Sequence, residues 1–312
     1  MTCIRGLIMG IAVGDALGVP VEFMHRSFLK DKPVLDMRGF GTHHQPAGTW
    51  SDDTSLSYCL AEQLIDGHDL DKLANRIVNW YELGYWTATG QFFDVGVSTR
   101  QAIDHLQRGI SPRLSGQKGE YANGNGSLMR ILPLAVFANN KTIDERWDLI
   151  GDISGITHQN MRTQIACFFL VEMAINLQKG YDKCDAFALT QNTVRDFVDA
   201  KECSAREQEI FLRLFFDDLS RFPEQEIFSS GYVIHTLEAS LWAFLTTNSF
   251  EEAVLKAVNL GDDTDTTGSI VGALAGLFYG IDHIPERWIN TLARQTDIQD
   301  LGHRFEIAMT RI

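Results

Sequence analysis

Apolar residues recur at three- and four-residue intervals along most of the chain, which is the period of amphipathic α-helices. Residues 56–65, 73–81 and 237–245 show this spacing, and residues 165–173 are apolar on most sides, as in a buried helix. Alternating apolar and polar residues, which are typical of half-buried strands, are scarce. Many helices joined by short polar segments predict an all-α protein, a compact globule of orthogonally packed helices.

The same pattern continues without a repeat, a low-complexity segment or a long linker, so we predict a single domain over residues 1–312. A chain of 312 residues, 45% of them apolar, can bury a large core without disulfides. The five cysteines are an odd number, and none lies in a CxxC pair. We therefore expect reduced thiols and no zinc held by thiolates.

Composition and charge exclude several classes of partner. The N-terminal segment does not resemble a signal peptide, because Asp15 interrupts its apolar run, and the other apolar stretches are too short to span a bilayer. We expect a cytoplasmic protein that does not associate with membranes. The net charge of −14 repels nucleic acid. It also means that a phosphate-bearing ligand needs local cations or backbone N–H groups.

Glycine recurs at every fourth position in two segments. Each such glycine costs a helix interior about 0.5–1 kcal/mol relative to alanine. Four at this spacing form a ridge of small residues along one helix face. We expect the ridges to allow close helix–helix approach, with the two facing each other at the centre of the fold. The ridges are Gly6, Gly10, Gly14, Gly18 and Gly268, Gly272, Gly276, Gly280.

Two acidic clusters, Ser51-Asp52-Asp53-Thr54 and Asp263-Thr264-Asp265-Thr266, each precede a predicted helix. Helix capping is the plain alternative for either cluster alone, because Ser, Thr and Asp are preferred caps. A cap needs only one or two such residues, however, and adjacent carboxylates repel each other. A hard cation would offset that repulsion, and oxygen ligands suit Mg²⁺ or Mn²⁺ better than Zn²⁺. The number of carboxylates is sufficient for two ions.

Further candidates are weaker when taken singly. Glu22 follows a Gly-Val-Pro turn that should end the first glycine helix; the alternative is a solvated loop residue. Residues 123–130 form a glycine-rich turn that enters a segment ended by Pro133. Such a turn can hold an anion on its N–H groups, or be a simple tight turn. Asp94 and His158 carry no strong signal of their own.

Taken in order, these motifs resemble the ADP-ribosylglycohydrolase family, which includes dinitrogenase-reductase-activating glycohydrolases and ADP-ribosylarginine hydrolases. The resemblance runs from about residue 4 to about residue 285. The matching elements are Gly14-Asp15-Ala16-Leu17-Gly18 with Glu22, Ser51-Asp52-Asp53-Thr54, Asp94-Val95-Gly96, Asn123-Gly124-Asn125-Gly126-Ser127-Leu128-Met129-Arg130, Thr157-His158, and Asp263-Thr264-Asp265-Thr266.

The resemblance implies an all-α fold of the ADP-ribosylglycohydrolase type with two Mg²⁺ ions, Mn²⁺ being the alternative metal. Glu22 and Asp94 would be the catalytic acids, without a decision on which is acid and which is base. The implied metal ligands are Ser51, Asp52, Asp53, Asp263, Asp265 and Thr266. The implied substrate-binding residues are Asn123, Gly124, Asn125, Gly126, Ser127, Met129 and His158.

The implied activity is hydrolysis of the bond between ADP-ribose and the arginine of a modified protein, with ADP-ribose as product. We expect a monomer. Alternatives are hydrolysis of O-linked ADP-ribose on serine or in O-acetyl-ADP-ribose, a non-catalytic ADP-ribose-binding protein, and a generic Mg²⁺ phosphohydrolase. The chain departs from the family pattern at Ser51, where Thr is usual, and at Asp262, where Gly is frequent. With few arginines around the glycine loop, the phosphates would depend on backbone donors and metals.

Overall fold

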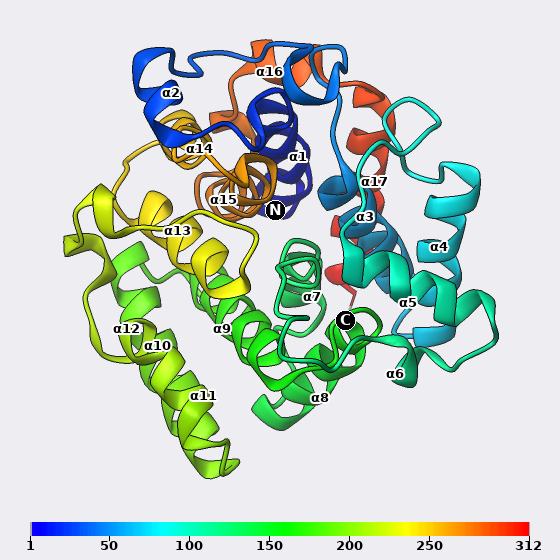
Figure 1. The fold of residues 1–312 in the computed structure, drawn as a ribbon, viewed down its shortest axis with the longest axis vertical. Helices are drawn as coiled ribbons and strands as arrows, with labels where there is room; N and C mark the ends of the chain where they lie inside the picture. The colour runs from blue at the N-terminus through cyan, green and yellow to red at the C-terminus, as the bar shows by residue number, and fades with distance from the viewer. Residues whose placement is uncertain (1, 312) are drawn as a thin grey trace.

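The computed structural model describes residues 2–311, which fold into helices joined by short loops (Figure 1). No β-strand occurs in this range, and only three isolated β-bridges are present. The all-α prediction is confirmed. The α-helices are α1 Thr2–Gly18, α2 Arg26–Asp31, α3 Asp52–Ile65, α4 Leu70–Leu83, α5 Val97–Gln107, α6 Pro112–Ser115, α7 Leu132–Phe137, α8 Ile143–Gly155, α9 Met161–Gln178, α10 Lys183–Ala200, α11 Ala205–Ile210, α12 Leu212–Phe216, α13 Val233–Leu245, α14 Phe250–Val258, α15 Thr264–Tyr279, α16 Glu286–Thr291 and α17 Gln295–Met309.

Short 3₁₀-helices occupy several of the connections. They are η1 Val19–Val21, η2 Gly41–His43, η3 Leu219–Arg221, η4 Glu224–Glu226 and η5 Ile281–His283. The four segments with helical apolar spacing lie in α3, α4, α9 and α13, as predicted. Helix α9 is buried along nearly its whole length, which explains why its apolar residues are not confined to one face.

The two glycine ridges pack against each other, as predicted, and bring α1 and α15 side by side in antiparallel orientation (Figure 1). Six of these glycines form facing pairs, and a β-carbon on any of the six would overlap a backbone carbonyl of the opposite helix, so only glycine permits this approach. Gly280 lies beyond the end of α15. The facing pairs are Gly6 with Gly276, Gly10 with Gly272, and Gly14 with Gly268.

This packing decides where the acidic residues meet. Helix α1 ends at Gly18, η1 follows, and Glu22 comes directly after it. Because α15 runs antiparallel, its N-terminus lies beside the C-terminus of α1. A β-carbon on Gly18 would overlap the backbone of Asp265. Glu22 and the second acidic cluster are therefore neighbours, although some 240 residues separate them in sequence.

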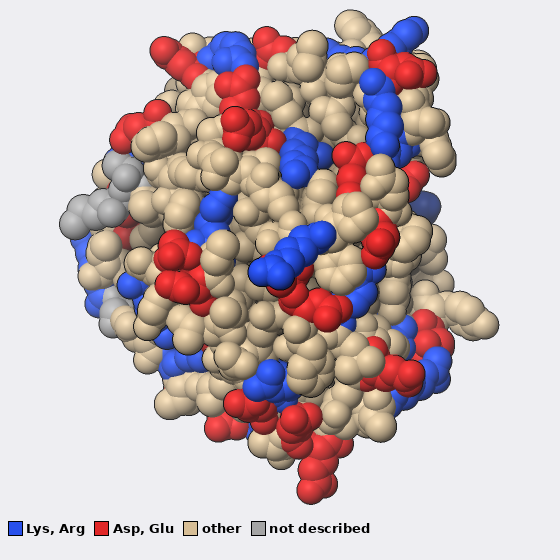
Figure 2. Space-filling view, turned by 90° about the vertical axis from the view of Figure 1, so that its left-hand side faces the viewer, with Lys and Arg blue, Asp and Glu red and all other residues tan. Residues whose placement is uncertain are grey.

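The segment Cys3–Val21 is apolar and long enough to cross a membrane, but 89% of its most apolar window is buried inside the protein. Its packing on α15 and α17 accounts for its composition. All five cysteines are free, as expected. On the face shown in Figure 2, acidic and basic side chains are interspersed, so the excess negative charge is not gathered into one patch there.

The expectation that Pro133 ends a segment is wrong, because Pro133 lies in the first turn of α7. Proline is tolerated there since the N–H groups of a first helical turn have no partner within the helix. The glycine-rich turn is thus followed by further turn residues up to Met129 and Arg130, and not directly by a helix N-terminus.

Candidate active site

One cavity of about 420 Å³ brings together most of the predicted site residues. They come from the loop after η1, the N-termini of α3 and α15, the loop before α5, the glycine loop and the loop before α9. The predicted residues that line it are Glu22, Asp52, Asp53, Asp94, Gly124, Asn125, Gly126, Met129, His158, Asp263, Asp265 and Thr266. Its volume is in the range of cavities that hold small molecules and cofactors.

Three predicted residues do not line this cavity. Ser51 is the N-cap of α3, and its hydroxyl accepts a hydrogen bond from Asp53 N at 3.2 Å. The Asn123 side chain turns to Glu120 O, to which Nδ2 donates at 2.6 Å. The Ser127 hydroxyl is fully buried, 3.6 Å from Cys167 Sγ. The capping alternative thus holds for Ser51, while Asn123 and Ser127 support the loop from outside the cavity.

The first acidic cluster is held in place by Asp15, a residue that sequence reasoning quoted in a motif without assigning it a role. Asp15 is fully buried in α1, and its carboxylate accepts hydrogen bonds from Ser51 N, Thr54 N and Thr54 Oγ1. It therefore caps α3 from outside that helix and fixes the direction of Asp52 and Asp53. A carboxylate within an otherwise apolar helix was the available signal.

The second acidic cluster is joined both to the first and to the glycine loop. Thr266 Oγ1 donates to Asp53 Oδ2 at 3.3 Å. Asn125 Nδ2 donates to Asp263 Oδ2 at 2.7 Å. Asp263 occupies the N-cap position of α15 but makes no side-chain capping bond. Capping does not account for this carboxylate, in contrast to Ser51.

Glu22 belongs to two groups of side chains whose ligand atoms lie close together. One carboxylate oxygen each from Glu22, Asp263 and Asp265 lie within 4.8 Å of one another, and the same holds for ligand atoms of Glu22, His43 and Asp94. The His43 Nε2 atom is hydrogen bonded to Glu22 Oε2, and its ring lies 5.1 Å from that of Phe93. Sequence reasoning missed His43, because nothing near residue 43 marks a contact with residue 22.

Burial and mutual repulsion raise the pKa values of these carboxyl groups. The pKa of Asp52, Asp53 and Asp265 is well above the usual range, first because burial penalises the charged form and then because neighbouring carboxylates repel it. Burial raises the pKa of Glu22 to about 7, and the hydrogen bond from His43 opposes this shift. The cavity is therefore a place where a positive charge would be strongly favoured.

Two carboxylate oxygens in the site point to the same conclusion. Among the described residues, Asp53 Oδ1 and Asp263 Oδ1 are buried and have no hydrogen-bond partner. A buried acceptor without a partner is costly unless another group satisfies it. Carboxylate and hydroxyl oxygens are the donors that hard divalent cations prefer. The residues present thus fit the predicted Mg²⁺ or Mn²⁺.

Gly126 in the glycine loop also has a packing role, beside the anion-binding role predicted for the loop. A β-carbon on Gly126 would lie 2.9 Å from His158 Cε1, so glycine is required for the close approach of the imidazole ring. The Asn125 N–H is already donated to Gly231 O at 3.1 Å and is not available to an anion. The loop is also less poor in cations than expected, because the buried Arg130 guanidinium donates to Gly126 O.

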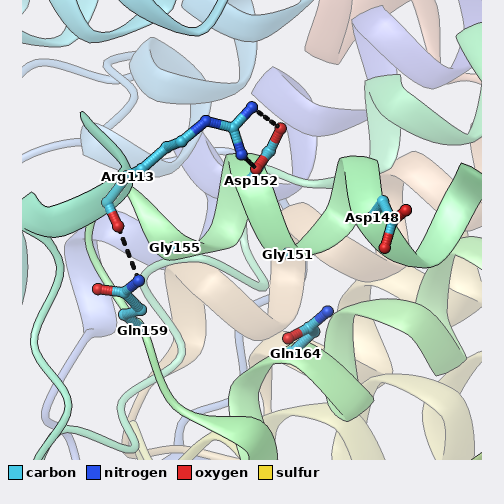
Figure 3. A pocket seen from close by; sticks show the side chains of 7 residues that line it. All are labelled: Arg113, Asp148, Gly151, Asp152, Gly155, Gln159 and Gln164. Atoms are coloured by element: carbon cyan, nitrogen blue, oxygen red, sulfur yellow. Dashed lines mark hydrogen bonds and ion pairs between the residues drawn. The ribbon is translucent and has the colours of Figure 1, made fainter. Parts of the chain in front are cut away.

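Asp262 has a φ of 59°, in the left-handed region that favours glycine. Its exposed side chain does not line the cavity, but its backbone exchanges hydrogen bonds with Phe23 N and Met24 O. This pairing fixes the segment that follows Glu22. A second cavity, of about 500 Å³, lies over α8 and contains none of the predicted site residues (Figure 3).

Comparisons with known proteins find relatives over nearly the whole chain. A family model described as ADP-ribosylglycohydrolase matches residues 3–311. An ADP-ribosylarginine hydrolase, Tri1 of Pseudomonas putida (strain GB-1), is 34% identical over 308 residues, covering 96% of this chain and 76% of the relative. An ADP-ribosyl-[dinitrogen reductase] glycohydrolase of Rhodospirillum rubrum is 29% identical, covering 92% and 89%. A solved structure titled ADP-ribosylglycohydrolase-related protein complex aligns with a TM-score of 0.82, 30% identity and 98% coverage of both chains.

A helical fold with a carboxylate-lined cavity, together with these relatives, indicates an enzyme that hydrolyses ADP-ribosyl linkages. The chain belongs to the ADP-ribosylglycohydrolase family, as its motifs predict.

Proposed function

We propose that this protein releases ADP-ribose from the arginine side chain of a modified protein, with two Mg²⁺ ions bound in the cavity. The main support is the meeting of two acidic clusters from distant parts of the chain with Glu22 and Asp94 in one cavity. The arginine linkage is supported by the 34% identity to a relative named as an ADP-ribosylarginine hydrolase.

The proposed metal ligands are the carboxylates of Asp52, Asp53, Asp263 and Asp265 and the hydroxyl of Thr266. Ser51 caps α3 and supports this set from behind. When bound, the two ions would supply Lewis-acid chemistry and a fixed attachment for sugar hydroxyls. Holding the sugar in one orientation can account for roughly 7–11 kcal/mol of the barrier in favourable cases.

We assign proton transfer and the binding of the leaving group to two carboxyl groups. Glu22 is held at Oε2 by His43 and faces the metal-binding acids, so it is the group that we expect to transfer a proton in the reaction. Asp94 is less buried, and its Oδ1 accepts from Val95 N at 2.8 Å. We expect Asp94 to orient the guanidinium of the modified arginine through charge-assisted hydrogen bonds.

The decisive experiment is a panel of proteins that carry ADP-ribose on arginine or on serine, incubated with the wild-type enzyme and Mg²⁺. Release of ADP-ribose from the arginine substrate at a higher kcat/KM than from serine is expected. Release from serine alone would refute the arginine assignment. Tight binding of ADP-ribose without release from either substrate would indicate a binding protein and refute the enzymatic function.

A further inference from the structure

A buried cation lies beside the glycine loop, and none of its hydrogen-bond partners among the described residues is a carboxylate. Arg130 is 0% exposed. Its guanidinium donates to Gly126 O, to Ile153 O at 3.1 Å and to Thr157 Oγ1 at 2.8 Å, and all three acceptors are neutral. Burial lowers the pKa of Arg130 to about 10. Burying a charge without an ion-pair partner costs folding free energy, so a functional role for its hydrogen bonds is expected.

The hydrogen bond from Arg130 to Thr157 determines where the proton of the Thr157 hydroxyl points. Thr157 Oγ1 lies 2.8 Å from His158 Nδ1, and both side chains are buried. Arg130 can only donate, so the hydroxyl accepts from it and keeps its own proton for another acceptor. Among the described residues, His158 Nδ1 is the acceptor within reach. If Nδ1 carried a proton instead, the hydroxyl proton would be buried without a partner, at a cost of about 1–3 kcal/mol.

The other ring nitrogen of His158 faces the ligand cavity. His158 lines that cavity, and its Nε2 and Cε1 atoms lie against Gly124 and Gly126. No hydrogen bond joins Nε2 to another of the described residues. Burial and the charge of Arg130 lower the pKa of His158 to about 3, so the ring is neutral at physiological pH.

We propose that Arg130 and Thr157 are positioning residues that hold His158 in one neutral tautomer, with its proton on Nε2. The chain of donors runs from the Arg130 guanidinium to the Thr157 hydroxyl, and from that hydroxyl to His158 Nδ1. His158 then presents a fixed N–H donor to the cavity beside the glycine loop.

The backbone around His158 is rigid enough for this role. Gln117 N donates to Thr157 O at 3.0 Å, and Gln159 N donates to Gln117 O at 2.7 Å. On the side facing the second cavity, Gln159 Nε2 donates to Arg113 O at 2.7 Å (Figure 3). These bonds tie the segment that carries the imidazole to residues 113 and 117 of the neighbouring chain segment.

The tautomer of His158 restricts which part of the ligand can bind there. This step rests on the proposed function. A neutral N–H donor requires an oxygen acceptor, such as a phosphate or sugar oxygen, and cannot bind the guanidinium end of the substrate. The ADP-ribosyl group would therefore place an oxygen at His158, and the arginine would bind elsewhere in the cavity, at Asp94.

The tautomer is measured directly by ¹⁵N NMR of histidine-labelled wild-type protein, with the His158 resonances assigned from their loss in His158→Gln. We expect an Nε2 signal typical of a protonated nitrogen and an Nδ1 signal typical of an unprotonated one, unchanged between pH 6 and 8 (about the range in which free histidine titrates). A proton on Nδ1 in the wild-type protein would overturn the proposal. This measurement requires no folded relay variant.

Calorimetric binding of ADP-ribose tests the relay. Thr157→Val removes the hydroxyl and should weaken binding about tenfold, the equivalent of one misplaced hydrogen bond, and should shift both ring ¹⁵N signals toward each other. Thr157→Ser restores the hydroxyl and should behave as wild type. Thr163→Val is the matched control, because this buried threonine bonds only the backbone of this loop, at His158 O and Asn160 O.

Binding by Thr157→Val that equals binding by Thr163→Val, with the same ¹⁵N signals as wild type, would overturn the relay. The two proposals fail separately. An enzyme that binds ADP-ribose with the expected tautomer but releases none from modified arginine would contradict the proposed function and leave the relay intact.

Discussion

At the scale of single residues, the site is defined by buried carboxyl groups that lie close enough to repel one another. Asp53 and Asp263 each keep one oxygen free of hydrogen bonds, and Asp265 of the second cluster is repelled by Asp53 of the first. Such residues reduce the stability of the folded chain and are retained for what they bind. Two other residues hold the site in place through hydrogen bonds. His43 is bonded to the Glu22 carboxyl group, and Asp15 accepts from the backbone at the start of α3.

The substitution Asp265→Asn should separate the effect of this carboxylate on activity from its effect on stability. It keeps the shape of the side chain and removes one of the repelling charges, so we expect ADP-ribose release to fall at least 100-fold while the midpoint of thermal unfolding without metal rises. Activity assays and thermal melts in EDTA measure the two effects. Asp282→Asn, at an exposed acid outside the cavity, should change neither. Near-normal turnover by Asp265→Asn would refute its proposed role as a metal ligand.

His158 makes a separate prediction about acid stability. Its pKa in the folded protein is about 3, below the ordinary value of 6.5. The unfolded chain therefore takes up a proton below about pH 6.5 and the folded chain does not, so this group's contribution to stability is present above 6.5 and is lost as the pH falls toward 3. Between pH 7 and 5 the wild type should lose roughly 2 kcal/mol more stability than His158→Gln.

Urea unfolding at the two pH values measures this difference. The matched control is His303→Gln at an exposed position, which should retain the pH dependence of the wild type. Equal losses of stability in wild type and His158→Gln would show that folding does not lower the pKa of this imidazole.

At the scale of elements, the antiparallel pair α1 and α15 determines the geometry of the site. Its glycine ridges set the distance between the helices, and its polar ends carry Glu22 and the second acidic cluster. The N-terminus of α3 is added to this pair through Asp15. The packing of these helices therefore also brings the residues of the site together.

Gly10→Ala tests the dependence of the site on this packing. Alanine favours helix formation by about 1 kcal/mol, but its β-carbon would overlap Gly272 O. We expect a net loss of about 3 kcal/mol in the free energy of unfolding and a lower affinity for Mg²⁺, because the two helix ends move apart. Chemical denaturation and metal titration measure these changes. Gly119→Ala, where the β-carbon meets nothing within 4 Å, should leave both unchanged.

At the scale of the whole molecule, the net charge of −14 and the buried acidic site make stability dependent on cations. If Mg²⁺ binds the folded cavity and not the unfolded chain, a concentration of 100 times Kd adds about 2.7 kcal/mol. For a chain of this size that corresponds to a rise of roughly 5 °C in the midpoint of thermal unfolding. Melts in MgCl₂ and in KCl of equal ionic strength distinguish binding from screening. An equal rise in both salts would contradict a specific metal site.

The sequence by itself determined the helical fold, the facing glycine ridges and the two acidic clusters. These features are periodic or local, and their signals lie within a few residues of each other. The family resemblance added Asp94 and His158, which line the cavity as anticipated. It could not show that Ser51, Asn123 and Ser127 lie behind the cavity wall, since the direction of a loop side chain depends on its packing.

Only the tertiary structure decided how distant residues are paired. Asp15 with Thr54, His43 with Glu22, and Arg130 with Thr157 are contacts between different segments of the chain. No spacing rule in the sequence encodes such contacts, because each joins segments that are distant in the sequence and meet only in the folded chain. The residue types alone predict the acidic clusters. The groups that hold and orient the site are identified only by the packing of α1, α3, α15 and the loop before α9.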